Sequence, residues 1–261
     1  MAMLFVKEVK EKMTEKSAVK NPLIIGHRGA AGEAPENTLA SFRLALEQGA
    51  DALELDVHMS ADGDIIVCHD ATVNRTTDGQ GAIDRMSTAE LRQLDAGRWF
   101  HERFAGERLP LLEEVFQLVP DNMMINVEIK CPYSTRLEER LLGLLREYGR
   151  METVVLSSFS HRILGRLQAA EPELRVGLLY SADVAFPHRK LAELSGMNVY
   201  SLHPSYRLIG PEDVADSTAH GLQVYVYTVN DERSQLAARE AGVSGIITDY
   251  PGRLRDLLER G

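Results

Sequence analysis

Short β-rich segments alternate with amphipathic helical segments from residue 23 to the end of the chain. This alternation constrains the fold strongly, because each helical crossover returns the chain to the same end of a parallel sheet. Eight strand–helix units are predicted, not counting the returning arm of one hairpin. The predicted strands are residues 23–27, 52–59, 123–130, 154–158, 175–180, 199–203, 223–229 and 245–249. The predicted helices are residues 38–48, 111–119, 136–148, 161–170, 188–195, 211–220, 231–241 and 251–259.

Eight such units in about 240 residues predict an α/β fold of the TIM (β/α)8 barrel type. An open, doubly wound sheet is the alternative architecture. Nucleotide-binding forms of that sheet carry glycine-rich motifs, and the sequence contains neither G-x-G-x-x-G nor a Walker A motif. No change of composition marks a second domain, so we expect residues 21–261 to form one barrel domain.

The second predicted strand leads into a hairpin and a long irregular segment. Asp62-Gly63 is a turn signal, and residues 65–68 form a returning arm that ends at His69. Residues 71–110 contain four glycines and only short helical stretches such as 88–94. We therefore expect a small insertion after the second strand, at about residues 71–110.

Bulk composition argues against several functional classes. A formal net charge of −10 disfavours a nucleic-acid binder or a stably membrane-associated protein, because both need basic surface. No apolar run of about 18 residues is present, so no transmembrane helix is predicted. The first 20 residues lack the apolar region and cleavage site of a signal peptide, which predicts a cytoplasmic protein.

Residues 1–20 are predicted to be an N-terminal extension that forms a frayed or short amphipathic helix. A homodimer through this segment is one open alternative. The chain has only two cysteines, Cys68 and Cys131, so no disulfide framework is expected.

The second predicted strand carries two carboxylates on one face. Glu54 and Asp56 are two residues apart, about 6.6 Å along a strand, and so point the same way. Leu53, Leu55 and Val57 take the opposite face, which must meet the surrounding helices. Both carboxylates therefore point into the barrel mouth, where they repel each other unless a cation or a proton lies between them. A salt bridge to a core Arg or Lys is the alternative explanation.

The third predicted strand repeats this pattern. Asn126, Glu128 and Lys130 share its inward face, so Glu128 adds a third inward carboxylate. A site with only oxygen donors favours Mg²⁺ or Ca²⁺ over zinc. Lys130 lies one pleat nearer the mouth, where it suits a phosphate oxygen or balances the charge of the carboxylates.

Two histidines are placed where barrel enzymes carry their chemistry. His27 ends the first strand, directly before Arg28, and His69 ends the hairpin. Histidine transfers protons near neutral pH, and arginine offers a fork of donors to phosphate oxygens. Cleavage of a phosphodiester needs a base for the attacking oxygen and an acid for the leaving one, which this pair could provide.

Several short motifs resemble, in order and spacing, the signature of the glycerophosphodiester phosphodiesterase family. The most specific block consists of His27-Arg28-Gly29, Pro35-Glu36-Asn37-Thr38, Gly49-Ala50-Asp51, Glu54-Leu55-Asp56-Val57, Asp62-Gly63 and His69-Asp70. Later pieces are Leu109-Pro110-Leu111-Leu112-Glu113-Glu114, Asn126-Val127-Glu128-Ile129-Lys130, Ser157-Ser158-Phe159, Tyr227-Thr228-Val229-Asn230 and Gly245-Ile246-Ile247-Thr248-Asp249. The resemblance covers residues 23–251 and is closest to the small cytoplasmic bacterial members.

The resemblance implies a metal-dependent hydrolase that converts a small glycerophosphodiester to glycerol 3-phosphate and an alcohol, in lipid and glycerol metabolism. Carried over onto this sequence, it implies three groups of site residues: Glu54, Asp56 and Glu128 as ligands of one divalent cation, His27 and His69 as the acid/base pair, and Arg28, Lys130 and Tyr227 as substrate-binding residues. The choice between Mg²⁺ and Ca²⁺, the identity of the alcohol and the division of roles between the histidines stay open.

Other residues have two readings each. Glu36 could belong to the metal shell or orient Arg28, and His58 is either a rim residue, as we expect, or a ligand. His203 ends a strand and either reaches the substrate or is structural. Trp99-Phe100 either caps the site or packs the insertion on the barrel.

Two rival functions fit the same barrel. An enzyme that acts on lysophospholipids or phosphoinositides would need an apolar or basic docking surface, which the sequence does not display. A non-enzymatic binder of a phosphate ligand would be expected to have lost a histidine or a metal carboxylate, and none is lost.

Overall fold

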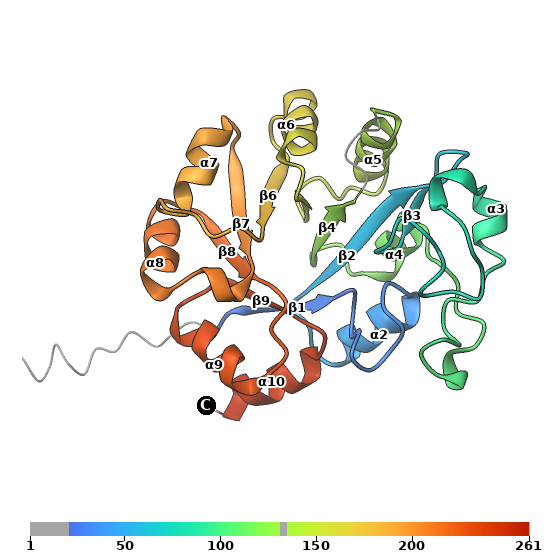
Figure 1. The fold of residues 1–261 in the computed structure, drawn as a ribbon, viewed down its shortest axis with the longest axis horizontal. Coiled ribbons are helices and arrows are strands. Elements are labelled where there is room, and N and C mark those ends of the chain that lie inside the picture. The colour runs from blue at the N-terminus through green and yellow to red at the C-terminus, as the bar shows by residue number, and fades with distance from the viewer. Residues whose placement is uncertain (1–20, 131–134, 261) are drawn as a thin grey trace, which may run out of the picture.

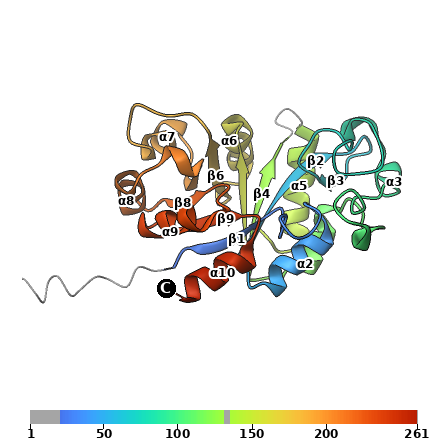
Figure 2. The same ribbon diagram turned by 60° about the horizontal axis from the view of Figure 1, so that its bottom comes forward.

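The structure is a computed structural model that describes residues 21–130 and 135–260, with helices arranged around a central set of strands (Figures 1 and 2). The barrel strands are β1 (Leu23–His27), β2 (Ala52–Met59), β4 (Met124–Ile129), β5 (Val154–Ser158), β6 (Arg175–Tyr180), β7 (Val199–Pro204), β8 (Gln223–Val226) and β9 (Gly245–Thr248). The helices that follow them are α2 (Leu39–Glu47), α4 (Leu112–Leu118), α5 (Thr135–Glu147), α6 (His161–Ala170), α7 (Arg189–Ser195), α8 (Pro211–Ala219), α9 (Glu232–Glu240) and α10 (Pro251–Arg260). The predicted N-terminal helix and Cys131 lie outside the described residues.

The sheet closes on itself. Its strands run in the order β1-β9-β8-β7-β6-β5-β4-β2, all paired in parallel, and β1 also pairs with β2. The predicted TIM (β/α)8 barrel is thus confirmed, and the open sheet is excluded. Closure places His27 beside Glu54 and, through β9, Gly26 beside Thr248, so residues from both ends of the chain meet at the mouth.

The bounds of these elements lie within one residue of the prediction, except for β8. This strand ends at Val226 instead of residue 229. Beyond it, Tyr227 makes only an isolated bridge to Ser205, and the N–H of Val229 turns to the carbonyl of Ile247. The local sequence continues the strand pattern, but the pairing partners run out.

Inward and outward positions alternate along the strands as expected. The outward Leu53, Leu55 and Val57 are fully buried in the core between the strands and the helices. The inward positions near the bottom of the barrel are apolar and form a separate cluster of Ile25, Ala52, Tyr225 and Ile247. The polar inward positions lie one pleat higher on the same strands, so the site rests on an apolar floor.

The predicted hairpin forms on β2. The strand β3 (Ile65–Val67) pairs antiparallel with residues 57–59, whereas β1 pairs with residues 52–54. The outer half of β2 is therefore covered by β3, which brings the end of the hairpin to the barrel mouth.

The insertion packs on this hairpin through a small apolar cluster that includes Ile66, Val73 and Leu91. It contains η1 (Ile83–Arg85), α3 (Thr88–Leu91) and η2 (Glu102–Phe104). The helix α3 ends at Leu91 instead of residue 94, because the N–H groups of Gln93 and Leu94 donate to carbonyls three residues back, not four, and the N–H of Asp95 donates to the side chain of Asp78 (2.7 Å).

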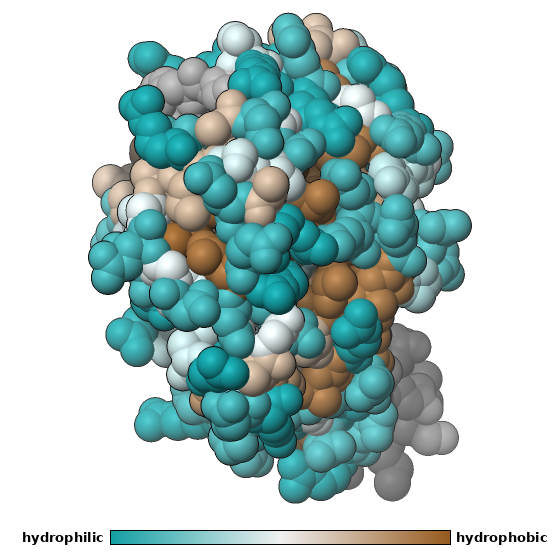
Figure 3. All heavy atoms as spheres, turned by 90° about the vertical axis from the view of Figure 1, so that its right-hand side faces the viewer, coloured by the Kyte–Doolittle hydropathy of each residue, from teal (hydrophilic) through white to brown (hydrophobic). Residues whose placement is uncertain are grey.

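Figure 3 shows the face of the molecule that carries the insertion: hydrophilic side chains cover most of it, and hydrophobic ones gather in patches between them. Within the insertion, Trp99 is the one large hydrophobic side chain that is exposed, at 40%. It packs edge to face on Phe100 (5.7 Å between ring centroids), and Phe100 on Phe104. In the part of the chain that the structure describes, no helix has the length and apolarity needed to cross a bilayer.

Candidate active site

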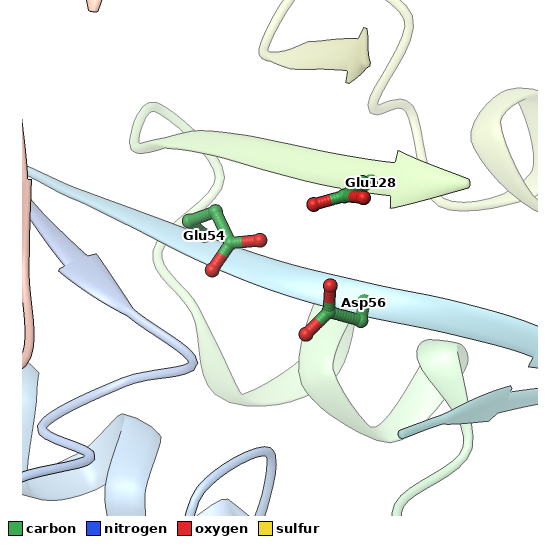
Figure 4. Close-up of side chains that lie close together, drawn as sticks. All are labelled: Glu54, Asp56 and Glu128. Carbon is green, nitrogen blue, oxygen red and sulfur yellow. The ribbon is translucent and has the colours of Figure 1, made fainter. Parts of the chain in front are cut away.

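Three carboxylates converge at the mouth of the barrel. Glu54 and Asp56 come from β2 and Glu128 from β4, where Asp56 and Glu128 are register partners. One oxygen of each lies within 4.8 Å of the others, and all three side chains point toward a common space (Figure 4). The inward orientation predicted from strand alternation is therefore observed.

Two cations contact this cluster. The backbone N–H of Arg28 donates to Glu54 Oε2 (3.0 Å), and its Nε lies 3.2 Å from Asp56 Oδ2. Lys130 Nζ lies 2.7 Å from Glu128 Oε1 and 3.2 Å from Asp56 Oδ1. Ion pairs with an arginine and a lysine, the alternative left open by the sequence, are thus present. Three carboxylates still outnumber the two cations by one formal charge.

Burial shifts the proton affinities of these carboxylates in different directions. Burial and the charge of Asp56 raise the pKa of Glu54 well above its ordinary range, and the same causes raise the pKa of Glu128 to about 7. Burial also acts on Asp56, but the charges of Arg28 and Lys130 hold its pKa below its usual value. The cluster therefore favours an added positive charge, as a proton or as a cation.

Two residues near the cluster have left-handed backbone. Arg28 has φ 52° and Asn37 φ 56°, which costs an L-residue energy unless the surroundings fix it. The N–H of Asn37 donates to the carbonyl of Arg28 (3.1 Å), and Ser41 Oγ donates to the same carbonyl (2.8 Å). Asn37 Nδ2 in turn donates to Asp56 Oδ2 (2.9 Å). The strained loop thereby aims Arg28 and Asp56 at one another; sequence reasoning assigned no role to Asn37.

His27 is oriented by an aspartate from the neighbouring strand end. Its Nδ1 lies 2.6 Å from Asp249 Oδ1, and its Nε2 lies 4.0 Å from Glu54 Oε2. Asn230 holds Asp249, since its Nδ2 donates to Asp249 Oδ2 (2.6 Å) and its Oδ1 accepts from the Asp249 N–H (2.9 Å). These interactions fix the imidazole with Nε2 toward the carboxylates. Asp249 and Asn230 belong to motifs found in the sequence, but their contact with His27 was not predicted.

His69 has an equivalent partner on its own loop. Its Nδ1 lies 2.7 Å from Asp70 Oδ1, and Arg75 Nε donates to Asp70 Oδ2 (2.8 Å). Arg75 also donates to both oxygens of Glu36, which accepts a further hydrogen bond from Arg28 (2.7 Å). Glu36 thus contacts Arg28, as expected if its role is to orient that arginine. Burial holds the pKa of His69 below its ordinary value, although Asp56 and Asp70 oppose this shift.

Two connected hollows open at the mouth. The inner pocket, of about 260 Å³, is lined by most of the predicted site residues: His27, Arg28, Glu54, His69, Glu128, Lys130 and Tyr227. Asp56, which is 1% exposed, is not among its lining residues. The outer groove, of about 760 Å³, shares His69, Glu128, Lys130 and Phe159 with the inner pocket and continues over the start of α6.

Aromatic side chains form one wall of the inner pocket. Tyr227 donates its hydroxyl to the carbonyl of Tyr180 (2.9 Å) and packs edge to face on Phe159 (6.2 Å between centroids). Tyr227 was expected to be a substrate-binding residue, whereas Phe159 had no assigned role. Its position two residues after the inward Ser157 was the signal available.

The remaining candidates lie away from the reacting groups. His203 is fully buried, bonds to Ser201 Oγ (2.8 Å), and lines neither hollow; burial lowers its pKa to about 3. His58 lines the outer groove, as expected of a rim residue, and its Nε2 bonds to the carbonyl of His69 (3.1 Å). Trp99 and Phe100 do not line the two hollows, which agrees with packing of the insertion.

Comparison with known proteins gives a family. The model of the glycerophosphoryl diester phosphodiesterase family matches residues 27–253. A glycerophosphodiester phosphodiesterase of Caldanaerobacter subterraneus subsp. tengcongensis is 42% identical over 243 residues, which are 92% of this chain and 98% of that protein. A human lysophospholipase D is 30% identical over 269 residues, 90% of this chain and 85% of that protein.

A solved structure is also similar over almost the whole chain. A phosphodiesterase from Oleispira antarctica, solved in complex with the product sn-glycerol-3-phosphate, superposes with a TM-score of 0.84 at 33% identity. The match covers 92% of this chain and 97% of that one. The chain therefore belongs to the glycerophosphoryl diester phosphodiesterase family, a family of hydrolases that cleave glycerophosphodiesters.

Proposed function

We propose that this chain is a metal-dependent enzyme whose catalytic domain, residues 21–261, hydrolyses small glycerophosphodiesters to glycerol 3-phosphate and an alcohol. One observation carries the proposal: three buried carboxylates, two cations and two histidines oriented by aspartates come together at one pocket in the barrel mouth. The product bound to the Oleispira relative supports a glycerol phosphate arm as the part of the substrate that is recognised.

Glu54, Asp56 and Glu128 would hold one divalent cation, Mg²⁺ or Ca²⁺. The donor set fits such an ion, because it consists of carboxylate oxygens and carries one negative charge more than Arg28 and Lys130 neutralise. Asp56 Oδ1 is buried and accepts no hydrogen bond of good geometry from the described residues, although Lys130 Nζ lies 3.2 Å away as an ion-pair partner. When bound, the cation would stabilise negative charge on the phosphate oxygens.

Arg28 and Lys130 are suited to hold the phosphate itself. Both side chains line the inner pocket and are mostly buried, where a charged donor contributes more than it does in water. Their present carboxylate partners keep them charged and directed at the cluster. The wall formed by Tyr227 and Phe159 would cover the glycerol arm and exclude water from it.

The two hollows suggest how the histidines divide the work. His27 lines only the inner pocket, and its Nε2 would accept a proton from the attacking oxygen, whether of water or of the glycerol 2-hydroxyl. His69 lines both hollows and therefore lies where the alcohol would depart, so its imidazolium would protonate that alcohol. Burial lowers the pKa of His69, but Asp70 and the negative phosphodiester next to it would oppose that shift and favour the protonated form.

The test is release of glycerol 3-phosphate from glycerophosphocholine, glycerophosphoethanolamine and glycerophosphoglycerol. We expect EDTA to abolish release and Mg²⁺ or Ca²⁺ to restore it. Glu128→Gln should lose activity about 10²-fold or more, because a neutral amide is a poor ligand for a hard cation. Glu240→Gln, an exposed change on α9, is the matched control and should retain full activity. Cleavage that EDTA does not affect would refute the metal site.

A second candidate is hydrolysis of lysophospholipids, in view of the human lysophospholipase D relative. The outer groove is lined by apolar side chains, Ala71, Ile129 and Phe159, as well as by polar ones such as Ser158 and Arg162, so its lining is compatible with an acyl chain. Rates on glycerophosphocholine and lysophosphatidylcholine, compared below the critical micelle concentration, distinguish the two: a faster lysolipid reaction would replace the first proposal.

A further inference from the structure

The outer groove has an unbalanced charge. Among its lining residues, Glu128 is the single carboxylate, and that carboxylate already contacts Lys130 (2.7 Å). Arg162, in the first turn of α6, adds a second cation to the lining. A positive rim of this kind is unexpected in a chain with a net charge of −10.

Arg162 differs from its neighbours in having no counter-charge. Within residues 21–130 and 135–260 it forms no ion pair, whereas Arg166, one turn further along the same helix, pairs with Glu138. Its side chain is exposed at the groove. A guanidinium that the protein does not neutralise is available to a ligand.

The other polar groups of the outer groove are neutral or basic. His161 Nε2 bonds to the carbonyl of Leu179 (2.9 Å), and His58 Nε2 bonds to the carbonyl of His69 (3.1 Å). Each ring therefore has its N–H at Nε2 committed, which leaves Nδ1 for other partners. A cationic alcohol such as choline would find Phe159 here but no free carboxylate among the described lining residues.

We propose that the outer groove is the subsite for the departing alcohol and that Arg162 makes it select an alcohol that carries an anionic group, a carboxylate or a phosphate. The inference rests on the proposed function, because it takes the alcohol to leave past His69, the histidine that the inner pocket and the outer groove share. The volume of about 760 Å³ accommodates an alcohol much larger than ethanolamine. Arg162 acts as a specificity-determining residue, remote from the reacting atoms.

Three substrates whose alcohols differ in charge test the proposal. These are glycerophosphoethanolamine, its N-acetyl derivative and its N-succinyl derivative, whose alcohol portions are positive, neutral and negative. We expect kcat/KM to rise in that order, with the N-succinyl substrate about fivefold better than the unmodified one, the size of one partly exposed ion pair. The difference should reside in KM and shrink in 0.5 M NaCl, because salt screens an exposed charge.

Arg162→Glu should reverse the order of the three substrates, while kcat on the N-acetyl substrate changes little. The matched control is Arg43→Glu, the same charge change at an exposed position of α2 that lines neither hollow. Comparing the terminal phosphate ester of glycerophosphoglycerol with glycerophosphoglycerate, which carries a carboxylate at that end, then shows which anion is preferred.

The outcomes separate the two proposals. If the wild-type enzyme cleaves all three substrates with equal kcat/KM, or if Arg162→Glu leaves their order unchanged, the charge selection is wrong and the proposed function stands. If none of the three releases glycerol 3-phosphate, the proposed function fails and the subsite fails with it. Equal melting temperatures of the two arginine variants exclude misfolding as the cause of any difference.

Discussion

Each of the two site histidines, His27 and His69, contacts an aspartate through Nδ1, but the two aspartates come from different parts of the molecule. On one side, His27 at the end of β1 meets Asp249 from the end of β9, 222 positions away in the chain. On the other side, His69 meets Asp70, its neighbour in sequence, and Arg75 from the insertion holds Asp70 in place. Both arrangements leave Nε2 directed away from the aspartate.

This difference teaches which forces maintain each histidine. His27 depends on pairing of β1 with β9, a buried ladder that salt does not screen. His69 depends on Arg75, whose side chain is 44% exposed and which bridges Asp70 and Glu36. Exposed ion pairs contribute little individually and weaken with salt. We therefore expect the orientation of His69 to be less firmly fixed than that of His27.

The largest effect should come from removal of the histidines themselves. His27→Ala should reduce kcat about 10³-fold on every substrate, because the attacking oxygen loses its base. His69→Ala should cause a similar loss on glycerophosphocholine but a loss of less than about tenfold on glycerophospho-p-nitrophenol, whose leaving group needs no proton. Steady-state rates on the two substrates test this; equal losses in both variants would show that the histidines do not divide the work as proposed.

Neutralising the two aspartates should give the next largest effect. Asp249→Asn keeps the shape of the side chain but removes the acceptor that fixes the His27 tautomer, and we expect about 10²- to 10³-fold loss of kcat. Asp70→Asn should cost about tenfold, because Asp70 is more exposed and its loop can adjust. A greater loss from Asp70→Asn would reverse the ranking of the two sides.

The carboxylate cluster lies between the two sides and gives a pH test of both. Burial and Asp56 raise the pKa of Glu128 to about 7, so this group holds a proton below that pH in the metal-free protein. A cation must displace that proton and also the proton of Glu54, whose pKa is likewise raised, so its affinity should fall at least about tenfold per pH unit below 7. Titration calorimetry in two buffers of different ionisation enthalpy measures the released proton.

The same pH change distinguishes protonation of the carboxylate cluster from protonation of His69. At a limiting metal concentration, acid should reduce the rates on glycerophosphocholine and on glycerophospho-p-nitrophenol together, because both reactions need the cation. An affinity that stays constant from pH 8 to pH 6 would contradict the raised pKa of Glu128.

The smallest effect should follow from loss of Arg75. Arg75→Ala removes both bridges of the His69 side, and we expect kcat on glycerophosphocholine to fall about three- to tenfold. The wild-type rate should decline toward that of the variant as NaCl rises to 1 M, whereas the variant should respond less. Arg43→Ala, at an exposed site on α2, serves as the control. A variant as salt-sensitive as the wild type would mean that Arg75 does not support His69.

Much of the architecture follows from local patterns. Period-two alternation on β2 and β4 correctly predicted that Glu54, Asp56 and Glu128 face inward, since successive side chains of a strand must point to opposite faces. Helix boundaries were also local: Thr38 caps α2 by accepting from the Ser41 N–H, and Gly49 takes the positive φ (76°) that ends it. Where the loss of pairing partners ends a strand, as at Val226, the alternation pattern predicted a strand that was too long.

The sequence by itself determined the barrel, the inward carboxylates and the candidate histidines, because these depend on periodicity and on positions at strand ends. Only the tertiary structure decided which groups touch: Asp249 on His27, Arg75 on Asp70, and both Arg28 and Lys130 among the carboxylates. These contacts depend on closure of the barrel and on how the insertion folds back. Residues far apart in the chain meet through such packing, which the spacing of residues in the sequence does not reveal.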